Sequence, residues 1–461
     1  MVEIFNRKDI LEHTKESEKE EVSNLLTLAL EAAKAADGYL SVRKALSRKG
    51  NVLKITDREY DLTLYEHVYI IGMGKASEPM AKAVYNIMSE RISGGIILVR
   101  SGTRKHKMLG KIRIFEGGHP VPTYEGFKNA QILTGYVKEA PKEKSLFFVL
   151  LSGGGSSIYA DFHPDLTVKE GILLNRLLVH TDASITEINA VRKHTAEGKG
   201  GQLARLLQGA AVISLILSDV PKNPLDTVAS GPVSPDTTTF QDAQEMLVNH
   251  GLWDKVPESV RERIEKGIRK KIPETPKPKD PCFDDVYPVV IADAVTACNA
   301  VTEKIKELYG GGYPVMSYPD VMTGSISEGL ARTLLDNCGV GFTLIGHEYT
   351  YGADLEKAGE GGRQLHLLLL MLKIMKEATY TDMYIEGIAT DGKDGNSWAG
   401  ALITPSLVGE TELQEVERAE REENSGGFFK ERGTLIRMKS EYGLDDTGTN
   451  VNNILIIHTV K

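Results

Sequence analysis

The chain has 461 residues, enough for two or three domains, and its 41% hydrophobic and 26% charged residues are typical of a globular protein. A formal net charge of -9 argues against nucleic acid or a membrane surface as a partner. The cysteines Cys282, Cys298 and Cys338 are too far apart for a zinc site or a disulfide framework, and the charged N-terminus lacks an apolar signal core. We therefore expect a cytoplasmic enzyme without a membrane span.

The first part of the chain alternates short apolar runs with helical patterns. A helix is expected at 18–36. Buried strands, which end in Gly or Ser, are expected at 68–72, 95–99, 145–152 and 212–218. Helical patterns lie between them at 78–90, 124–139, 167–180 and about 196–208. Strands that alternate with helices in this way predict a mostly parallel α/β sheet.

A proline-rich stretch, K-I-P-E-T-P-K-P-K-D-P-C (271–282), is predicted to be a linker. Beyond it the same alternation resumes, with strands expected at 287–292, 341–346, 383–389 and 453–458 and helices at about 294–309, 326–337 and 362–378. The sequence therefore predicts an N-terminal α/β domain of residues 1–282 and a second, smaller α/β domain of residues 283–461.

Ligands bind beyond the carboxyl ends of parallel strands, so the polar residues there are the candidates for function. I-I-G-M-G-K-A-S (70–77) joins a strand to a helix, and Gly72 and Gly74 would let the backbone approach an anion near Lys75. The stretch misses the dinucleotide fingerprint because Ser77 replaces the third glycine, and it misses the P-loop pattern as well. A tight turn with a solvated lysine is the alternative.

A second glycine-rich loop, L-S-G-G-G-S-S (151–157), follows another buried strand. Its glycines expose backbone N–H groups and its serines add hydroxyl donors, so the loop is suited to phosphate oxygens. The residues predicted to bind a nucleotide here are Ser152, Gly153, Gly154, Gly155, Ser156 and Ser157. A flexible turn is the alternative.

Charged residues follow in two further stretches. Arg192, Lys193 and His194 stand together within 188–204, where an arginine could clamp a carboxylate or a phosphate by a bidentate bond. A solvated basic helix face is the alternative. Asp219 comes at the end of a strand, which is a common location for a carboxylate that faces Mg²⁺, although a turn or helix cap would use the same residue type.

In the second domain, G-E-G-G-R-Q (359–364) places Arg363 after a glycine-rich loop, and A-T-D-G-K-D-G-N (389–396) places Asp391 and Asp394 among glycines. The latter stretch lacks the final glutamate of a calcium loop. Glycines that suit phosphate, lone cations and lone aspartates occur without a metal-ligating His pair or a nucleophile elbow. That inventory is typical of phosphoryl transfer, in which positioning and charge neutralisation do most of the work.

The order and spacing of these motifs resemble the glycerate kinase family that carries a MOFRL domain at its C-terminus. The resemblance covers roughly residues 20 to 460 and is carried by G-M-G-K-A-S (72–77), G-H-P-V-P (118–122), L-S-G-G-G-S-S (151–157), I-N-A-V-R-K-H (188–194), G-G-Q-L-A (200–204), S-D-V (218–220), A-S-G-P (229–232), G-G-R (361–363), T-D-G-K-D-G (390–395) and T-G-T-N-V-N (447–452). It implies a Rossmann-like N-terminal domain, a mixed α/β MOFRL domain and an active site in the cleft between them. It also implies phosphorylation of D-glycerate by ATP with Mg²⁺, and 2-phosphoglycerate as the usual product.

The same resemblance implies roles for individual residues. Lys75 and Arg363 look like the family's basic pair, one from each domain, and the loop at 153–157 looks like its nucleotide phosphate loop. We expect Arg192 and Arg363 to hold the glycerate carboxylate or the transition-state charge and Asp219 to be a ligand of Mg²⁺. Further residues expected at the nucleotide are Asn189 and Lys193, and those expected at or behind the substrate are Gly74, His194, Asp391 and Asp394. Asp219, Asp391 and His194 are the candidates for a general base.

Two stretches differ from the family's usual text. I-G-H-E-Y-T (345–350) stands where relatives generally have G-G-E-T-T, and G-G-R-Q-L-H (361–366) stands where they have G-G-R-N-Q-E. A kinase of a related hydroxy or aldonic acid is therefore an alternative. Alternatives of other classes are a nicotinamide-dependent hydroxy-acid oxidoreductase and a non-catalytic nucleotide-binding homologue. The partners expected are small molecules, with a homodimer as a further option.

Overall fold

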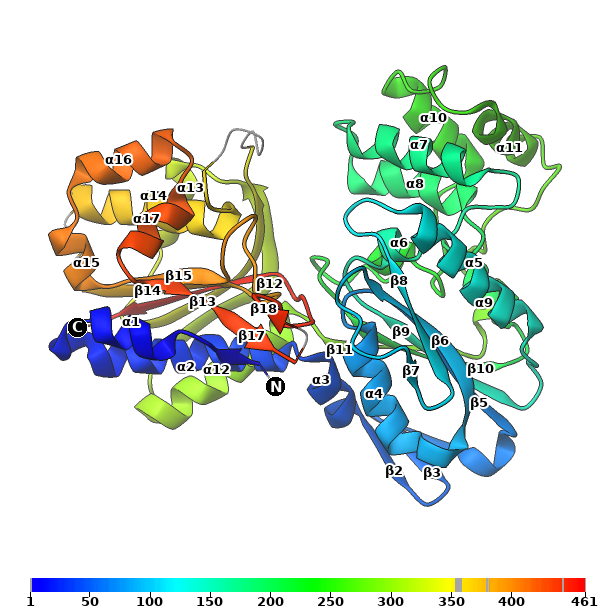
Figure 1. Ribbon diagram of the computed structural model, residues 1–461, viewed down its shortest axis with the longest axis horizontal. Coiled ribbons are helices and arrows are strands. Elements are labelled where there is room, and N and C mark those ends of the chain that lie inside the picture. The colour runs from blue at the N-terminus through cyan, green and yellow to red at the C-terminus, as the bar shows by residue number, and fades with distance from the viewer. Residues whose placement is uncertain (1, 353–358, 379, 381, 442, 461) are drawn as a thin grey trace. The chain divides into compact units, whose positions relative to one another are not determined.

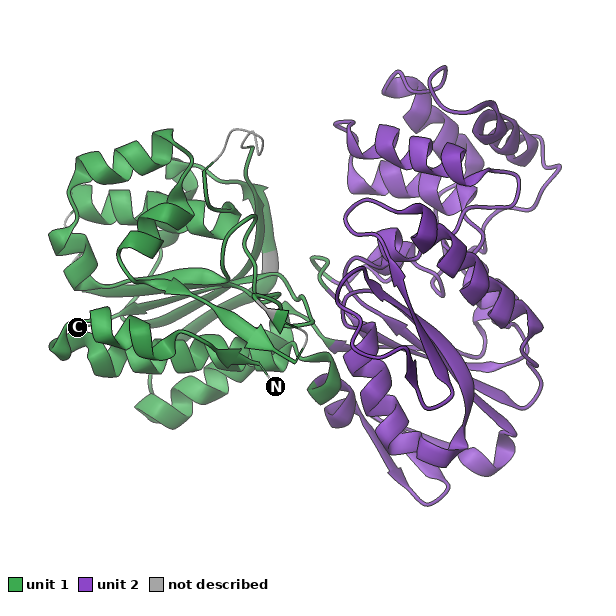
Figure 2. Cartoon of the chain, viewed as in Figure 1, with its two compact units in different colours: residues 1–40, 219–222, 292–461 green, residues 41–218, 223–291 purple. Residues whose placement is uncertain are grey.

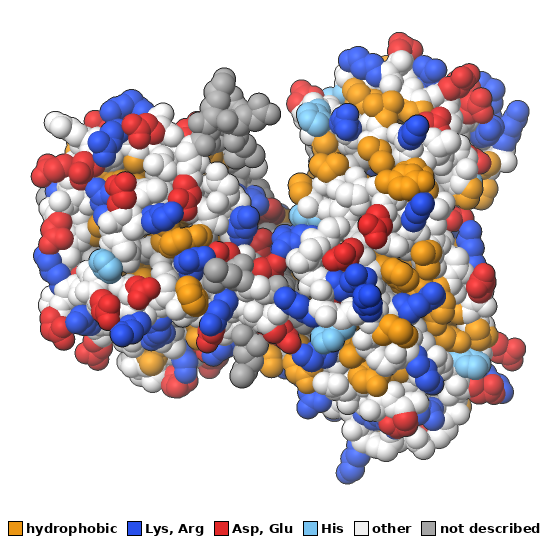
Figure 3. All heavy atoms as spheres, viewed as in Figure 1, with side chains coloured by type: hydrophobic (Ala, Val, Ile, Leu, Met, Phe, Trp, Pro, Cys, Tyr) orange, Lys and Arg blue, Asp and Glu red, His pale blue; other side chains and the backbone are white. Residues whose placement is uncertain are grey.

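A computed structural model (Figure 1) describes residues 2–352, 359–378, 380, 382–441 and 443–460. The chain forms two compact units (Figure 2), which are described separately below. Unit 1 comprises Met1–Leu40, Asp219–Lys222 and Ala292–Lys461, and unit 2 comprises Ser41–Ser218 and Asn223–Ile291. On the face shown in Figure 3, Lys and Arg side chains are interspersed with Asp and Glu over both units. No helix in the described part of the chain is long and apolar enough to cross a membrane.

Unit 2 is built on a seven-stranded sheet with the order β11-β10-β9-β5-β6-β8-β7. Its strands are β5 (His67–Met73), β6 (Ile92–Arg100), β7 (Met108–Leu109), β8 (Ile112–Gly117), β9 (Ser145–Leu151), β10 (Ala211–Leu217) and β11 (Val286–Ala292). The strands β10, β9, β5, β6 and β8 are parallel, and the short edge strand β7 is antiparallel to β8. The mostly parallel sheet predicted from the sequence is thereby confirmed. β9 is buried along its whole length, as its continuous apolar run requires.

Helices cover this sheet and add a helical layer beside it. They are α4 (Ser77–Met88), α5 (Tyr124–Glu139), α6 (Gly155–Ile158), α7 (Val168–Val179), α8 (Ile185–Thr195), α9 (Gln202–Leu207), α10 (Phe240–Asn249), α11 (Glu258–Ile268) and the 3₁₀ turns η2 (Leu62–Leu64), η3 (Ser89–Arg91), η4 (Val228–Ser230) and η5 (Pro281–Phe283). A further helix, α3 (Gly38–Ala45), contains the boundary between the two units, at residues 40 and 41. A small antiparallel sheet contains β2 (Leu46–Lys49), β3 (Val52–Ile55) and β4 (Arg58–Asp61). The helices α7, α8, α10 and α11 share an apolar core. Capping boxes at Thr167, Ser184 and Thr239 fix the first residues of α7, α8 and α10.

Unit 1 is built on a six-stranded mixed sheet with the order β12-β13-β19-β14-β15-β16. The strands are β12 (Val315–Ser325), β13 (Gly341–Thr350), β14 (Met383–Ala389), β15 (Gly400–Ile403), β16 (Leu435–Ile436) and β19 (Asn453–Thr459), and a second small sheet holds β1 (Glu3–Ile4), β17 (Met438–Ser440) and β18 (Gly443–Leu444). β12 and β13 are parallel, whereas β13, β19, β14, β15 and β16 pair antiparallel in turn. The mixed sheet predicted for the smaller domain is therefore confirmed.

Helices lie on both faces of this sheet (Figure 1). They are α1 (Arg7–His13), α2 (Lys19–Ala35), α12 (Ala294–Tyr309), α13 (Glu328–Asp336), α14 (Arg363–Ala378), α15 (Pro405–Glu410), α16 (Leu413–Arg421), α17 (Ser425–Glu431) and the 3₁₀ turn η1 (Glu16–Glu18). α14 is buried at nearly every position from Gln364 to Met375, because it packs on the sheet and is covered by α13 and α16. The apolar run at the start of this helix therefore reflects a fully enclosed helix rather than an amphipathic one.

The division of the chain differs from the predicted boundary at residues 282 and 283. Residues 1–40, expected in the N-terminal domain, belong to unit 1, because α2 packs its apolar face on α12 and β14. β11, expected to open the second domain, is instead an edge strand of the unit 2 sheet. The proline-rich stretch 271–282 is held against unit 2 rather than acting as a free linker, since the N–H of Asp236 donates to the carbonyl of Pro276 (2.9 Å).

Candidate functional site

The two glycine-rich loops of unit 2 leave neighbouring strands of its sheet and are hydrogen-bonded to each other. Met73 at the end of β5 lies opposite Leu151 at the end of β9. Beyond these residues the N–H of Lys75 donates to the carbonyl of Gly153 (3.0 Å), and the N–H of Ala76 donates to Oγ of Ser152 (3.0 Å). The predicted nucleotide ligand Ser152 is buried, and its hydroxyl oxygen serves this internal bond. The loops therefore form one structural element that places Lys75 beside the glycine run.

Gly74 is required for this close approach. Its φ of 132° is a conformation that residues with a Cβ rarely adopt, and a Cβ there would overlap Oγ and the carbonyl of Ser152. Gly154 is a similar case, because its φ is 78° and a Cβ would lie 2.7 Å from Cδ2 of His119. His119 belongs to the motif G-H-P-V-P, which the sequence pattern did not single out as part of the site.

The loop 152–157 leaves several backbone donors unused. The N–H of Gly155 donates to the carbonyl of Ser152, and that of Ser157 donates to the carbonyl of Gly154. Within the described residues, the N–H groups of Gly153, Gly154 and Ser156 have no acceptor. A run of free N–H groups around a left-handed glycine forms a concave site for an anion. The predicted suitability for phosphate thus has a geometric basis.

A turn with left-handed backbone conformation at 229–231 is hydrogen-bonded to this loop. Oγ of Ser230 lies 2.8 Å from Oγ of Ser156 and 3.2 Å from Oδ1 of Asn189, and the carbonyl of Ser230 accepts the N–H of Gly200 (2.9 Å). Ala229 and Ser230 both have a positive φ, 52° and 60°. Such strain persists where the surroundings hold the backbone firmly, and it is concentrated at functional sites. Ser230 joins three separate stretches, a role that its place in A-S-G-P did not reveal.

The basic residues of α8 point to different partners. Lys193 is buried and forms ion pairs with Asp236 (3.2 Å) and Asp226 (3.1 Å). His194 is fully buried, with Nδ1 2.7 Å from the carbonyl of Ala190 and Nε2 3.0 Å from Oε2 of Glu274. Lys193 and His194 therefore attach α8 to the rest of unit 2.

Glu274 shows how strongly this part of α8 is held. Burial opposes ionisation of its carboxyl group, but hydrogen bonds from His194 and from the N–H of Phe240 lower its pKa to about 2. Glu274 lies in the stretch that was predicted to be a linker, so nothing in the sequence indicated this partner for His194.

Arg192, on the same helix, has no carboxylate partner for its positive charge among the described residues. Its Nη2 donates to Oδ1 of Asn175 on α7 (3.0 Å), and no carboxylate of the described residues lies within ion-pair distance. Burial lowers the pKa of its guanidinium. Asn189, one helical turn earlier, is connected through Ser230 to the glycine loop. Arg192 is therefore a partly buried cation on the helix that is connected through Asn189 and Ser230 to the free N–H groups.

In unit 1, Arg363 is the first residue of α14, and its Nη1 lies 3.3 Å from Oε1 of Glu348. Asp394 accepts the N–H groups of Gln364 (3.1 Å) and Leu365 (2.8 Å) and so caps the same helix. Burial raises the pKa of Asp394 to about 6, against the lowering effect of these N–H groups. Asp394 thus supports the helix start from which Arg363 projects.

Asp219 and Asp391 also lie in unit 1, beside the polar stretch 447–452. Oδ2 of Asp219 accepts from Nδ2 of Asn450 (3.3 Å), and the carbonyl of Asp391 accepts the N–H of Thr447 (3.1 Å). The described residues contain no group of three or more His, Cys, Asp or Glu side chains that could hold a metal. Mg²⁺ commonly binds one or two carboxylates and completes its shell with water and phosphate oxygens, so Asp219 fits it as a single ligand.

The two stretches that differ from the family's text contain buried polar atoms without partners. Both ring nitrogens of His347 and both amide atoms of Gln364 lack a hydrogen bond of regular geometry within the described residues. Each side chain is fully buried, and burial lowers the pKa of His347 to about 3, against a weak interaction with the neighbouring Gln364 that raises it. The imidazole is therefore neutral at physiological pH.

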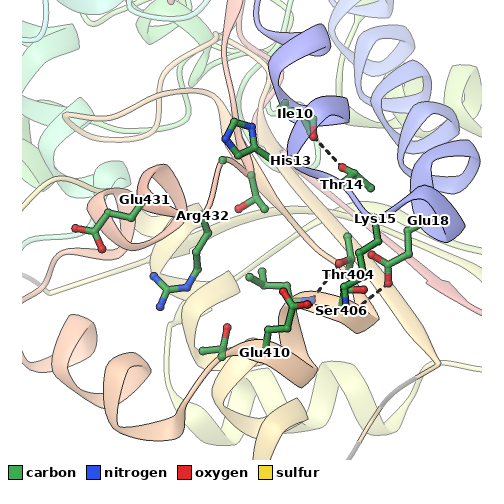
Figure 4. A pocket seen from close by; sticks show the side chains of 14 residues that line it. Ile10, His13, Thr14, Lys15, Glu18, Thr404, Ser406, Glu410, Glu431 and Arg432 are labelled. Carbon is green, nitrogen blue, oxygen red and sulfur yellow. Dashed lines mark hydrogen bonds and ion pairs between the residues drawn. The ribbon is translucent and has the colours of Figure 1, made fainter.

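Unit 1 also contains a polar cavity of about 440 Å³ between α1 and α15 (Figure 4). Its cations are already paired with carboxylates, because Lys15 lies 2.6 Å from Glu410 and Arg432 lies 2.8 Å from Glu415. Glu18 accepts the N–H of Ser406 (2.9 Å). This internal pairing distinguishes the cavity from the surroundings of Arg192.

Comparisons with known proteins cover nearly the whole chain. The family model DUF4147, described as a domain of unknown function, matches residues 24–265, and the MOFRL family model matches residues 342–453. A glycerate 2-kinase of Pyrococcus horikoshii is 31% identical over 94% of this chain and 96% of its own length. A protein of Agrobacterium vitis named putative hydroxypyruvate reductase is 31% identical over 74% of this chain and 76% of its own length. The crystal structure of glycerate kinase from Thermotoga maritima superposes with a TM-score of 0.76 at 25% identity, covering 95% of this chain and 99% of that one.

Proposed function

From the premise that this chain belongs to the glycerate kinase family with a C-terminal MOFRL domain, we propose that it phosphorylates D-glycerate with ATP and forms 2-phosphoglycerate and ADP. The observation that carries the proposal is the loop 152–157, where free N–H groups of Gly153, Gly154 and Ser156 surround a concave backbone beside Lys75. This arrangement suits the phosphate oxygens of a nucleotide, which need several donors and a compensating charge.

The residues of unit 2 divide the work of phosphoryl transfer between them. The free N–H groups of the loop bind phosphate oxygens, while Ser230 and Asn189 keep the loop in shape. The ammonium group of Lys75 stabilises the negative charge on the transferred phosphoryl group. Because transfer proceeds through a loose transition state, such positioning and charge stabilisation account for most of the rate.

The acceptor needs a cation for its carboxylate and a place for the proton of its hydroxyl. Arg192 supplies the first cation, and Arg363 at the start of α14 supplies a second for the carboxylate or the transition-state charge. His194 is sealed between Ala190 and Glu274, so Asp219 and Asp391 remain as proton acceptors. Mg²⁺, with Asp219 as its ligand from the chain, would neutralise charge on the nucleotide phosphates.

A coupled assay of ADP release over D-glycerate, L-glycerate and longer aldonic acids tests the proposal. We expect the highest kcat/KM with D-glycerate, and ³¹P NMR of the product distinguishes 2-phosphoglycerate from 3-phosphoglycerate. Lys75→Ala should lower kcat by about 10²–10³, the usual cost of removing one contact to developing charge. Unchanged turnover in that variant would contradict the role of Lys75. A better aldonic-acid substrate would replace glycerate in the proposal.

A nicotinamide-dependent oxidoreductase is the second candidate, because one relative carries the name putative hydroxypyruvate reductase. The third glycine of a dinucleotide fingerprint is absent, since the buried Ser77 takes that position at the start of α4. Thermal unfolding separates the two candidates. Mg-ATP should raise the melting temperature, and NADH should not. Stabilisation by NADH with reduction of hydroxypyruvate would favour the oxidoreductase, and stabilisation by ATP without turnover of any acid would indicate a non-catalytic homologue.

A further inference from the structure

Arg192 is held by a neutral side chain from a neighbouring helix. Its Nη2 donates to Oδ1 of Asn175 at 3.0 Å, and Asn175 is 7% exposed on α7. Capping boxes at Thr167 and Ser184 fix the first turns of the two helices, so the relative position of these side chains is built into the helical layer.

The fully buried cations of unit 2, unlike the partly buried Arg192, have carboxylates as partners. Lys193 is paired with Asp236 (3.2 Å), Lys199 with Asp161 (3.0 Å) and Arg263 with Asp165 (3.0 Å). Arg192 is only partly buried, so its guanidinium keeps some contact with solvent, but its protein partner is an amide and not a carboxylate. Removing part of its hydration without supplying a counter-ion costs free energy, which the amide alone does not offset. Among the described residues, no carboxylate lies within ion-pair distance of Arg192.

The positive charge of Arg192 also affects the pKa of the nearby Lys199. Burial lowers the pKa of the Lys199 ammonium, Asp161 opposes that effect, and the charge of Arg192 adds to the lowering. Lys199 is neutralised by Asp161, which leaves the charge of Arg192 as the uncompensated one of the two. An anion that binds here would replace the missing carboxylate.

We propose that Asn175 is a positioning residue that orients the guanidinium of Arg192 without neutralising it, so that Arg192 stays available for the carboxylate of the acceptor. The proposal rests on the proposed kinase function, because it takes the glycerate carboxylate as the ligand. The amide oxygen accepts one N–H and leaves the remaining donors of the guanidinium for a bidentate contact. An aspartate at the same place would form an internal ion pair and would compete with the substrate.

The isosteric variant Asn175→Asp tests this role, because it keeps the shape of the side chain and adds only the competing charge. We expect KM for D-glycerate to rise at least about tenfold, while KM for ATP and kcat stay within about twofold. Asn249→Asp, at an exposed position on α10, is the control for the change in net charge and should leave all three parameters unchanged. An unchanged KM for D-glycerate in Asn175→Asp would overturn the proposal.

A purely structural role of Asn175 is distinguished by two further measurements. Asn175→Asp should unfold at no lower temperature than the wild type. Asn175→Ala removes the contact with Arg192 and shows how far the melting temperature falls when that contact is lost. In the background of Arg192→Gln, Asn175→Asp should no longer change KM for D-glycerate, because its effect passes through Arg192. An equal effect in both backgrounds would overturn the proposal.

Binding measured without turnover keeps this inference separate from the kinase proposal. Calorimetric titration of D-glycerate into the wild type and Asn175→Asp, without ATP, reports the role of Arg192 directly. Glycerate binding that Asn175→Asp weakens, in a protein that releases no ADP with glycerate, would contradict the kinase proposal and support the role of Asn175. Turnover of glycerate, together with equal glycerate binding by the wild type and Asn175→Asp, would support the kinase proposal and contradict the role of Asn175.

Discussion

The two units of this protein treat their buried polar groups differently. In unit 2, the buried cations of Lys193 and Lys199 and the hydroxyl of Ser230 have partners of fitting chemistry. Within the described residues, the buried side-chain atoms that lack a hydrogen bond lie in unit 1, apart from the hydroxyls of Ser77 and Ser214. Buried polar groups are usually satisfied, so unit 1 carries a larger desolvation cost.

This difference coincides with the departures from the family's text. His347 and Gln364, which are among the unsatisfied side chains of unit 1, occupy the stretches 345–350 and 361–366. The glycine loops of unit 2, by contrast, keep the family's residues and the bonds that join them. Unit 2 therefore keeps the family's residues in its glycine loops, whereas the departures from the family's text lie in unit 1.

The largest effect should come from giving unit 2 an unpaired buried charge. Asp236→Ala leaves the ammonium of Lys193 with the half-exposed Asp226 alone and also removes the acceptor of Thr275 (2.9 Å). Breaking a buried pair from one side typically costs about 3–5 kcal/mol of unfolding free energy. Urea unfolding measures the loss. Asp226→Ala is the matched control and should cost clearly less, because Asp226 keeps contact with solvent; an equal loss in both would show that Lys193 does not depend on Asp236.

The predictable part of the fold follows from hydrophobic pattern. The continuous apolar runs of β5, β9 and β10 identify strands covered on both faces, and the glycines after β5 and β9 predict the turns that follow them. β12 was not predicted, because this long edge strand is largely exposed and lacks a continuous apolar run. The position of residues 1–40 was also not predictable, since packing of α2 on α12 joins segments far apart in the chain.

The candidate site shows the same limit at the level of side chains. In the sequence, the basic run 192–194 offers three equivalent cations. In the structure Arg192 contacts Asn175, Lys193 contacts Asp236, and His194 contacts Glu274. Residue types at a motif indicate which chemistry is available, but whether a charge is free or already paired depends on contacts with distant segments. This is why the residue types indicate a loop suited to phosphate at 152–157, whereas nothing in the sequence indicates that Asn175 is the partner of Arg192.

The second effect concerns Glu386 on β14, which is fully buried and whose carboxyl oxygens lack a hydrogen bond of regular geometry within the described residues. Burial raises its pKa well above the ordinary value, against the attraction of Arg7 and a weak interaction with the backbone of Ala29. The native state therefore keeps a proton that the unfolded chain releases, so stability falls as pH rises above the unfolded pKa, by up to about 1.4 kcal/mol per pH unit.

Glu386→Gln removes this proton and should flatten the pH dependence. We expect the unfolding free energy to exceed that of the wild type by an amount that is larger at pH 8 than at pH 6, measured by urea unfolding at each pH. Glu139→Gln, at an exposed position, is the control. It should change the free energy of unfolding by the same amount at pH 6 and at pH 8. A gain that does not grow with pH would mean that Glu386 is ionised in the native protein.

The smallest effect has the opposite sign and comes from His347. Burial lowers the pKa of its imidazole to about 3, so below pH 6.5 the unfolded chain takes up a proton that the native state refuses. Its contribution to stability is therefore present above pH 6.5 and is lost as pH falls, by about 2 kcal/mol between pH 6.5 and pH 5. His347→Phe keeps a ring for the stack on Tyr349 (4.6 Å between centroids) and should abolish this loss, whereas the exposed His180→Phe should retain it. If His347→Phe also leaves glycerate turnover unchanged, the departure at 345–350 alters the stability of unit 1 and not the chemistry; a changed preference among aldonic acids would instead assign His347 to substrate selection.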